Sequence, residues 1–326
     1  MPSELLDDAW SAMLEARHQA MAGAGDLVFL RHGDRWSCAA ADDSAIDTAT
    51  EILQVGSVQR PAPRHARVSR YAPQQSGVPT FTHPDDRPVA TGLLTFARLY
   101  LPTVLGAAAA RRAGRSFVVA HVTQSLDGRI ACANGQSQWI GNDEDMRHAH
   151  RMRALCDGVL VGAGTAMQDD PRLTVRHVDG PDPRRIVLSG RGRVLATLGG
   201  RNLANGPGCI VVLGDDVEAE PPTAHVELLP VTATDDGRLD PIAITTALRG
   251  QGVHSLYLEG GAATASSFLQ AKAIDLLQVH VAAIVLGSGI ASFDLHPIEH
   301  VRDALPVTMD HVALNGHLLL NCWPRR

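Results

Sequence analysis

From residue 116 to the C-terminus, short and continuously apolar runs alternate with segments of helical spacing. Strands are expected at 116–123, 158–163, 184–189, 209–214, 225–231, 255–261 and 277–287, and helices at 142–156, 240–251 and 262–271. A strand that is apolar along its whole length must be covered on both faces. The alternation therefore predicts an α/β fold, with a mostly parallel sheet flanked by helices.

The last two apolar segments, between about 306 and 323, follow a different pattern. They are separated by Asn315-Gly316, a dipeptide typical of a two-residue hairpin turn. We therefore predict a C-terminal antiparallel hairpin at the edge of the sheet.

Residues 1–112 follow neither pattern and predict a small N-terminal α+β extension, separate from a domain at 113–326. Its expected parts are a helix at 4–23, a hairpin at 26–40, an irregular connection at 55–90 and a helix at 91–113 kinked near Pro102. No catalytic pattern is recognisable there. We interpret the extension as a cap or an oligomerisation arm.

Composition excludes several classes of protein. With 45% hydrophobic residues, 20% charged residues and a net charge of −6, the chain is typical of a globular enzyme and has no basic surface for nucleic acid. We found no apolar run near the roughly 20 residues that span a bilayer, so no membrane partner is expected. The five cysteines form no CxxC pair, which favours a cytoplasmic location over a disulfide framework.

Two strand ends carry glycine loops. Glu259-Gly260-Gly261 ends the strand in SLYLEGGAATASSFLQA and precedes a helix whose free N–H groups suit a phosphate. Carboxyl ends of parallel strands are where open α/β sheets bind ligands. The alternative is a tight turn with a solvated glutamate. In GAGTAMQDDPRLTVR, residues 162–176, a polar cluster and Arg176 follow Gly162 and Gly164, although Asp170 alone is equally consistent with a structural turn.

A third candidate loop is SLDGRIACANGQSQWIG, residues 125–141. Ser137 and Trp139 lie between an expected strand and a helix that Asn142 caps, with Arg153 near the end of that helix. Because an exposed tryptophan is a poor use of a large apolar ring, we expect something flat to pack against Trp139.

A fourth strand end, in RRIVLSGRGRV, carries Ser189 and Arg191. In dinucleotide sites an acidic residue here binds the ribose 2′-hydroxyl, whereas serine with arginine accommodates a 2′-phosphate. The sequence therefore favours NADP over NAD, with a basic surface turn as the alternative.

We expect no metal site. His148 and His150 are two positions apart on a helix and so point in different directions. The stretch from His296 to His300 matches HxxEH, but Pro297 fits only a helix start and no further ligand follows.

Four motifs in one order, SLDGRIA, GQSQWI, GAGT…DDPRLTVR and LEGGA, resemble the reductase domain of bacterial riboflavin biosynthesis. The likeness covers about 115–323 and implies a dihydrofolate-reductase-like fold. The family reduces the ribosyl group of 5-amino-6-(5-phosphoribosylamino)uracil to ribityl with NADPH. Members generally form a homodimer, which we expect here.

The resemblance also implies roles for particular residues. The substrate residues would be Ser137, Arg153, Leu173, Arg176 and Glu259. The NADPH residues would be Thr123, Trp139, Thr165, Asp169, Gly260, Gly261, Ala262, Ala263 and Thr264, beside Ser189 and Arg191. His121 and Glu259 would be the catalytic pair.

The chain departs from the family in two ways. His121 occupies the position at which the family commonly has lysine, although histidine also donates a proton near neutral pH. Residues 1–112 lack the HxE and PCxxC zinc ligands of the deaminase that often precedes the reductase. Two alternatives stay open: a reductase of another pyrimidine, pterin or specialised metabolite, and a non-catalytic nucleotide-binding protein.

Overall fold

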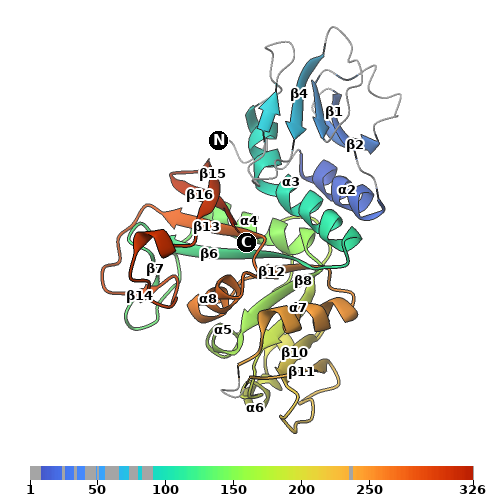
Figure 1. Ribbon diagram of the computed structural model, residues 1–326. Helices are drawn as coiled ribbons and strands as arrows, with labels where there is room; N and C mark the ends of the chain where they lie inside the picture. The colour runs from blue at the N-terminus through green and yellow to red at the C-terminus, as the bar shows by residue number, and fades with distance from the viewer. Residues whose placement is uncertain are drawn as a thin grey trace.

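The computed structural model describes residues 9–23, 26–32, 35–40, 49, 51–55, 66–72, 80–82, 91–234 and 238–325. A nine-stranded sheet with helices on both faces forms the larger part of the molecule. A five-stranded sheet lies beyond helices α2 and α3, which separate the two sheets (Figure 1).

The nine-stranded sheet has the order β11-β10-β9-β8-β12-β6-β13-β16-β15 and is parallel from β11 to β13. The strands are β6 (Phe117–Ser125), β8 (Gly158–Gly162), β9 (Arg184–Leu188), β10 (Cys209–Gly214), β11 (Val226–Val231), β12 (Ser255–Leu258), β13 (Leu276–Ala282), β15 (Val307–Leu314) and β16 (His317–Pro324). β15 and β16 form the antiparallel hairpin, and both turn residues, Asn315 and Gly316, have positive φ. The expected fold class is therefore confirmed.

Alternate residues of each parallel strand enter two separate cores. Val119 packs on the side covered by α3 (Thr91–Arg112) and α4 (Asp143–Leu155). Its neighbours Val118 and Ala120 pack on the side covered by α7 (Pro241–Gly250) and α8 (Ala262–Gln270). Burial of both faces is what continuous apolar strands require.

Several short elements were not expected from the sequence. Their bounds are α5 (Ala163–Asp169), α6 (Leu195–Leu198), the 3₁₀ turns Asn202–Ala204 and Val301–Asp303, and a two-stranded sheet of β7 (Arg129–Ala131) with β14 (Ile290–Ala291).

The smaller sheet has the order β2-β1-β3-β4-β5. Its elements are α2 (Trp10–Met21), β1 (Leu27–His32), β2 (Arg35–Ala40), β3 (Glu51–Val55), β4 (Arg67–Ala72) and β5 (Thr80–Thr82). The predicted hairpin is confirmed as antiparallel β1 and β2. Its turn at 33–34 and the first part of the predicted helix, 4–8, lie outside the described residues.

The prediction of an irregular connection at 55–90 was wrong in part, because β4 and β5 lie there. β4 pairs with β3 in parallel, so it depends on a long-range partner that its own sequence, RVSRYA, did not reveal.

Helix α3 corrects the statement that no apolar segment reaches membrane-spanning length. Gly92–Arg112 is long and apolar enough by length and composition, but 61% of its most apolar stretch is buried inside the protein. Phe96, Tyr100 and Val104 on this helix belong to the core that also contains Val119. We therefore describe α3 as a core helix.

The two sheets share one core through α2, α3 and α4. Arg151 of α4 is fully buried, with its guanidinium 5.5–5.8 Å from the ring centres of Trp10, Phe96 and Tyr100. Arg17 of α2 donates to the carboxylate of Asp157 at 2.9 Å. The N-terminal extension therefore covers the outer side of α4.

Candidate active site

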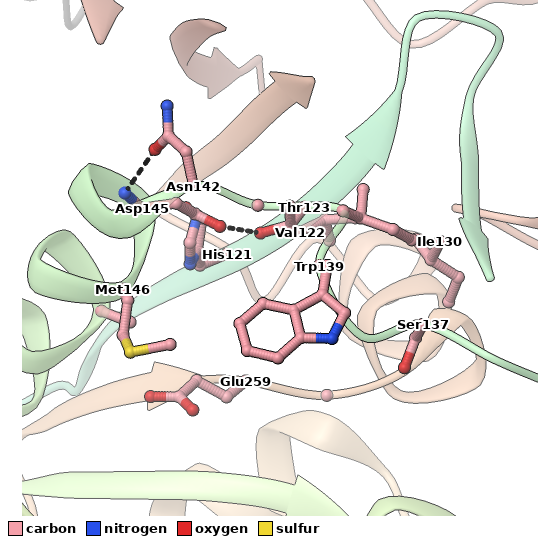
Figure 2. Close-up of a pocket in the computed structure, with 14 residues that line it drawn as sticks. His121, Val122, Thr123, Ile130, Ser137, Trp139, Asn142, Asp145, Met146 and Glu259 are labelled. Carbon is pink, nitrogen blue, oxygen red and sulfur yellow. Dashed lines mark hydrogen bonds and ion pairs between the residues drawn. The ribbon is translucent and has the colours of Figure 1, made fainter. Parts of the chain in front are cut away.

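The carboxyl ends of β6 and β12 border a cavity of about 360 Å³. The loop from 130 to 142 and the first turns of α4 complete its wall (Figure 2). The lining residues that the sequence singled out are His121, Thr123, Ser137, Trp139, Glu259 and Gly260. The stretch 121–149 thus meets Glu259 and Gly260, which lie more than 100 residues further along the chain.

Trp139 is the most unusual residue of this wall. It has φ of +71°, a region that bulky residues rarely adopt, and is 83% exposed. Its ring lies across the cavity between β6 and Glu259 (Figure 2). Strain together with exposure of a large apolar ring is typical of ligand-binding positions.

Glu259 is held by Arg153 across the site. Both carboxylate oxygens accept from the guanidinium, at 2.6 Å from Nε and 2.6 Å from Nη2. Arg153 also donates to the carbonyl of Thr174 at 3.0 Å. Glu259 is thus the acceptor of a mostly buried bidentate ion pair and not a solvated glutamate at a turn.

The segment after α5 brings Leu173 and Arg176 beside this pair. Leu173 is buried although its φ is +55°. The backbone N–H of Arg176 donates to Nδ1 of His150 at 2.8 Å, and its exposed side chain donates to the hydroxyl of Thr174. The pKa of His150 is lowered to about 3, mainly by burial and then by the positive charges of Arg153 and Arg176.

A second cavity, of about 300 Å³, lies on the other side of the 260–264 turn. Gly260 faces the first cavity, whereas Ala263 and Thr264 line the second together with Leu188 and Gly190 at the end of β9. The turn is therefore common to both cavities.

Glycines allow the close packing of this turn. A Cβ on Gly260 would lie 2.8 Å from Cβ of Thr264, and one on Gly162 would lie 2.7 Å from its hydroxyl. A Cβ on Gly261 would lie 3.8 Å from the hydroxyl of Thr165. Ala262 follows the two glycines and is the first residue of α8.

Ser189, Arg191 and Asp169 were also predicted to bind the cofactor, but they do not line the first cavity. Ser189 is buried, and its hydroxyl accepts from the backbone N–H of Val194 at 3.3 Å. Arg191 and Asp169 are exposed, and partial burial raises the pKa of Asp169. Asp170 is structural, since its carboxylate accepts from the backbone and side chain of Asn202 at 3.0 Å each.

Residues 116–314 match the RibD C-terminal domain family. The chain belongs to this family. It is 32% identical over 221 residues to the 2,5-diamino-6-ribosylamino-4(3H)-pyrimidinone 5′-phosphate reductase of Methanothermobacter thermautotrophicus, over 63% of this chain and 96% of that protein. It is also 32% identical to the riboflavin biosynthesis protein RibD of Mycobacterium tuberculosis, over 64% of this chain but only 55% of that protein.

Solved structures extend the likeness to the N-terminal extension. Acinetobacter baumannii RibD superposes with a TM-score of 0.61 and 21% identity, covering 98% of this chain and 100% of that one. The overall RibD-type fold is thus present across both sheets. The chain is accordingly an enzyme of the riboflavin-biosynthesis reductase family, which in general uses a nicotinamide cofactor.

Beside this cavity, a buried polar cluster on the α4 side of the sheet was not expected from the sequence. Asp145 accepts from the Thr123 hydroxyl at 2.7 Å, and its other oxygen lies 3.2 Å from Nε2 of His121 and 3.0 Å from Nδ1 of His280. His121 Nδ1 lies 2.8 Å from the hydroxyl of Tyr257. Asp145 also lies in the first turn of α4, where a negative charge is favourable.

A signal for this cluster was present in the sequence. In β13 the polar residues Gln278 and His280 alternate with apolar ones, and the register sets them beside His121 and Thr123 of β6. A period of two places these side chains on one face. Among the residues that the structure describes, no group of three or more histidine, cysteine, aspartate or glutamate side chains is arranged to hold a metal ion.

Proposed function

We propose that this chain reduces the ribosyl group of 5-amino-6-(5-phosphoribosylamino)uracil to ribityl with NADPH, as a cytoplasmic homodimer. The observation that carries the proposal is the single cavity in which His121, Ser137, Trp139 and Glu259 meet. Membership of the RibD C-terminal domain family supports the reaction type.

The residues around the shared 260–264 turn fit a dinucleotide. A carrier spanning both cavities would pass over Gly260 and Gly261, close to the first N–H groups of α8. Trp139, Thr165 and Thr264 border its path. NADPH, when bound, supplies the hydride.

The chain's own residues would bind and orient the substrate. Arg153 and Arg176 present guanidinium donors for the sugar phosphate, Ser137 a hydroxyl, and Leu173 an apolar wall. Glu259 fixes the direction of Arg153 through two hydrogen bonds. Holding the reacting carbon against the carrier contributes about 7–11 kcal/mol when the alignment is complete.

Ser189 and Arg191 support the choice of NADPH over NADH. The Arg191→Ala variant should raise KM for NADPH about tenfold and leave KM for NADH unchanged, since a charge-assisted contact to phosphate contributes about 1.5 kcal/mol. Steady-state kinetics with both cofactors measures this difference. An equal change for the two cofactors would remove Arg191 from the 2′-phosphate site.

A second substrate is favoured by a specific observation. The archaeal relative, which the chain covers almost entirely, is named for 2,5-diamino-6-ribosylamino-4(3H)-pyrimidinone 5′-phosphate. Residues 1–112 also lack the HxE and PCxxC patterns of a zinc deaminase, so this chain would not convert one pyrimidine into the other.

The decisive experiment is NADPH oxidation by the purified chain with each pyrimidine in turn. Turnover with the uracil supports the proposal, and a preference of kcat/KM for the diaminopyrimidinone supports the second substrate. NADPH binding without turnover on either would contradict both and favour another heterocycle or a non-catalytic nucleotide-binding role.

A further inference from the structure

The segment 171–176, which follows α5, belongs to no helix or strand, and side chains of α4 bind its backbone. Arg153 Nη1 donates to the carbonyl of Thr174 at 3.0 Å. Two residues further along, the backbone N–H of Arg176 donates to His150 Nδ1 at 2.8 Å. Backbone groups two residues apart lie on the same edge of an extended segment, and His150 and Arg153, three positions apart, lie on the same face of a helix. One face of α4 therefore takes the place that a neighbouring strand has in a sheet.

The conformation of this segment depends on such contacts. Leu173 is buried with φ of +55°, which is rare and costly for a residue other than glycine. A residue in this region persists only where its surroundings hold it. The edge opposite α4 is also bound, since the N–H of Val175 donates to a carboxylate oxygen of Asp182 at 2.6 Å. The position of Arg176 is thus set by hydrogen bonds to side chains rather than by regular secondary structure.

The two arginines of the site meet at one carbonyl group. Arg153 Nη1 and Arg176 Nη1 both donate to the oxygen of Thr174, at 3.0 Å and 3.3 Å, which brings the two guanidinium groups together. Glu259 pairs with only the first of them. The pKa of Arg176 is lowered, first by partial burial and then by the charges of Arg153 and Arg172. Guanidinium groups that repel one another in this way are suited to bind a doubly charged anion such as a phosphate.

His150 acts on this segment as a hydrogen-bond acceptor. A backbone amide always donates, so Nδ1 carries no proton and the neutral ring has its proton on Nε2. The contact of 3.5 Å between Nε2 and Arg153 Nη1 then joins two donors and is not a hydrogen bond. The side chain is only 2% exposed. Its lowered pKa, about 3, keeps Nδ1 available as an acceptor at neutral pH.

We propose that His150 is a positioning residue of the substrate site: it holds the backbone of Arg176 so that the guanidinium groups of Arg176 and Arg153 bind the same substrate phosphate. His150 does not touch the substrate in this role. It fixes the direction from which Arg176 approaches the phosphate, as Glu259 fixes that of Arg153. The inference rests on the proposed function and concerns affinity for the phosphate, not hydride transfer.

The test compares His150→Leu, which removes the acceptor, with His150→Asn, whose Oδ1 can occupy the place of Nδ1. We expect His150→Leu to raise KM for the phosphorylated pyrimidine about tenfold, because a buried hydrogen bond that holds Arg176 is lost. KM for NADPH and kcat should change by less than about twofold, and His150→Asn should recover most of the loss. With the dephosphorylated pyrimidine both variants should equal the wild type, since the group that Arg176 binds is then absent.

The matched control is His148→Leu. His148 is also buried on α4, but its ring nitrogens contact the Tyr100 hydroxyl and Gln278 instead of the segment 171–176. This variant should lose stability without a change in KM for the phosphorylated pyrimidine. Four results would each overturn the inference: an equal rise of KM in this control, an unchanged KM in His150→Leu, no recovery in His150→Asn, and the same loss with the dephosphorylated compound.

Hydrogen exchange tests the contact without turnover. The backbone amide of Arg176 should exchange slowly in the wild type and in His150→Asn, and rapidly in His150→Leu, while the amides of β6 stay equally protected in all three. Rapid exchange at Arg176 in the wild type would overturn the inference even if His150→Leu failed to fold.

Binding of ribose 5-phosphate, measured by calorimetry, separates this inference from the proposed function. We expect its affinity to fall about tenfold in His150→Leu and to be retained in His150→Asn. This result together with a wild type that does not oxidise NADPH in the presence of the pyrimidine would contradict only the proposed function. Equal affinity of His150→Leu and the wild type for ribose 5-phosphate would overturn the role of His150 even in an active enzyme.

Discussion

The two sheets of this molecule differ in what they bury. Among the described residues, the buried polar groups of the smaller sheet and its helices are Gln54, Ser69 and Thr103, none of which ionises. The larger sheet buries His121, His280 and Asn321 in its strands and Asp145 in the covering helix. Burying polar groups is costly unless they are paired, so their concentration on one sheet marks where the chemistry lies.

The smaller sheet reaches the site through α2 and α3. Tyr100 and Trp10 enclose Arg151 of α4, the helix that also carries Asp145 and Arg153. The comparison predicts a supporting role for one sheet and a chemical role for the other. Variants in each part test this difference.

The largest effect is expected from deleting residues 1–112. The sequence alone suggested that a cap could be removed without loss of chemistry. The shared core shows that deletion would expose the apolar side of α4 and β6, including Val119 and Met152. We expect the fragment 113–326 to aggregate or to lose cooperative unfolding, as measured by size exclusion and calorimetry. A folded, active fragment would show that the smaller sheet is dispensable.

The second-largest effect is expected from a variant of the larger sheet, Glu259→Gln. Glu259→Gln should lower kcat about a hundredfold with KM for NADPH nearly unchanged, since Arg153 loses its charged partner. Loss of one charge from a buried pair should also cost about 3 kcal/mol in the free energy of unfolding.

The control for this variant is Glu227→Gln. Glu227 also pairs with an arginine, Arg184, but both side chains are more than 40% exposed. Such a pair contributes about 0–1 kcal/mol, so neither stability nor turnover should change measurably. Equal behaviour of the two variants would remove Glu259 from the active site.

Lowering the pH should destabilise the larger sheet before the smaller one. The pKa of His148 is about 3 in the folded chain, against 6.5 for an ordinary histidine. The unfolded chain thus binds more protons between these values, and stability falls as pH is lowered from 6.5 towards 3. Cys38 of the smaller sheet, with its pKa raised to about 12 mainly by burial, does not titrate in this range.

Melting temperature measured from about pH 7 to pH 4, with limited proteolysis at each point, checks this order. His148→Gln should flatten the pH dependence, and the first cleavages in acid should fall in α4 or β13. First cleavage within β1 or β3 would contradict it.

The difference between the sheets also explains what the sequence could predict. Strands such as β8 and β10 are apolar throughout, so their pattern is sufficient. β4, RVSRYA, has no clear apolar period, and its position depends on parallel pairing with β3, which no local pattern contains.

In the candidate site, too, local patterns were predictable from the sequence and long-range contacts were not. Strand-end glycines led to Glu259 and Gly260, because local turn chemistry requires them. The partner of Glu259, Arg153, was expected to bind substrate, but only packing of α4 on the sheet reveals that the two side chains bind each other. Asp145 was recognisable as part of a helix start and not as the centre of a buried cluster, since its histidine partners come from β6 and β13.

The smallest effect tests the contact between the two parts of the molecule. The hydroxyl of Tyr100 lies 3.2 Å from Nδ1 of His148, at the boundary between α3 and α4. Tyr100→Phe removes this bond from a buried nitrogen and should cost about 1 kcal/mol in the free energy of unfolding, with kcat unchanged. Tyr257→Phe removes one buried hydroxyl from β12 and should change kcat as well, because its partner is His121. If Tyr100→Phe lowered kcat as much as Tyr257→Phe at equal stability, the N-terminal extension would be part of the chemistry and the division between the sheets would fail.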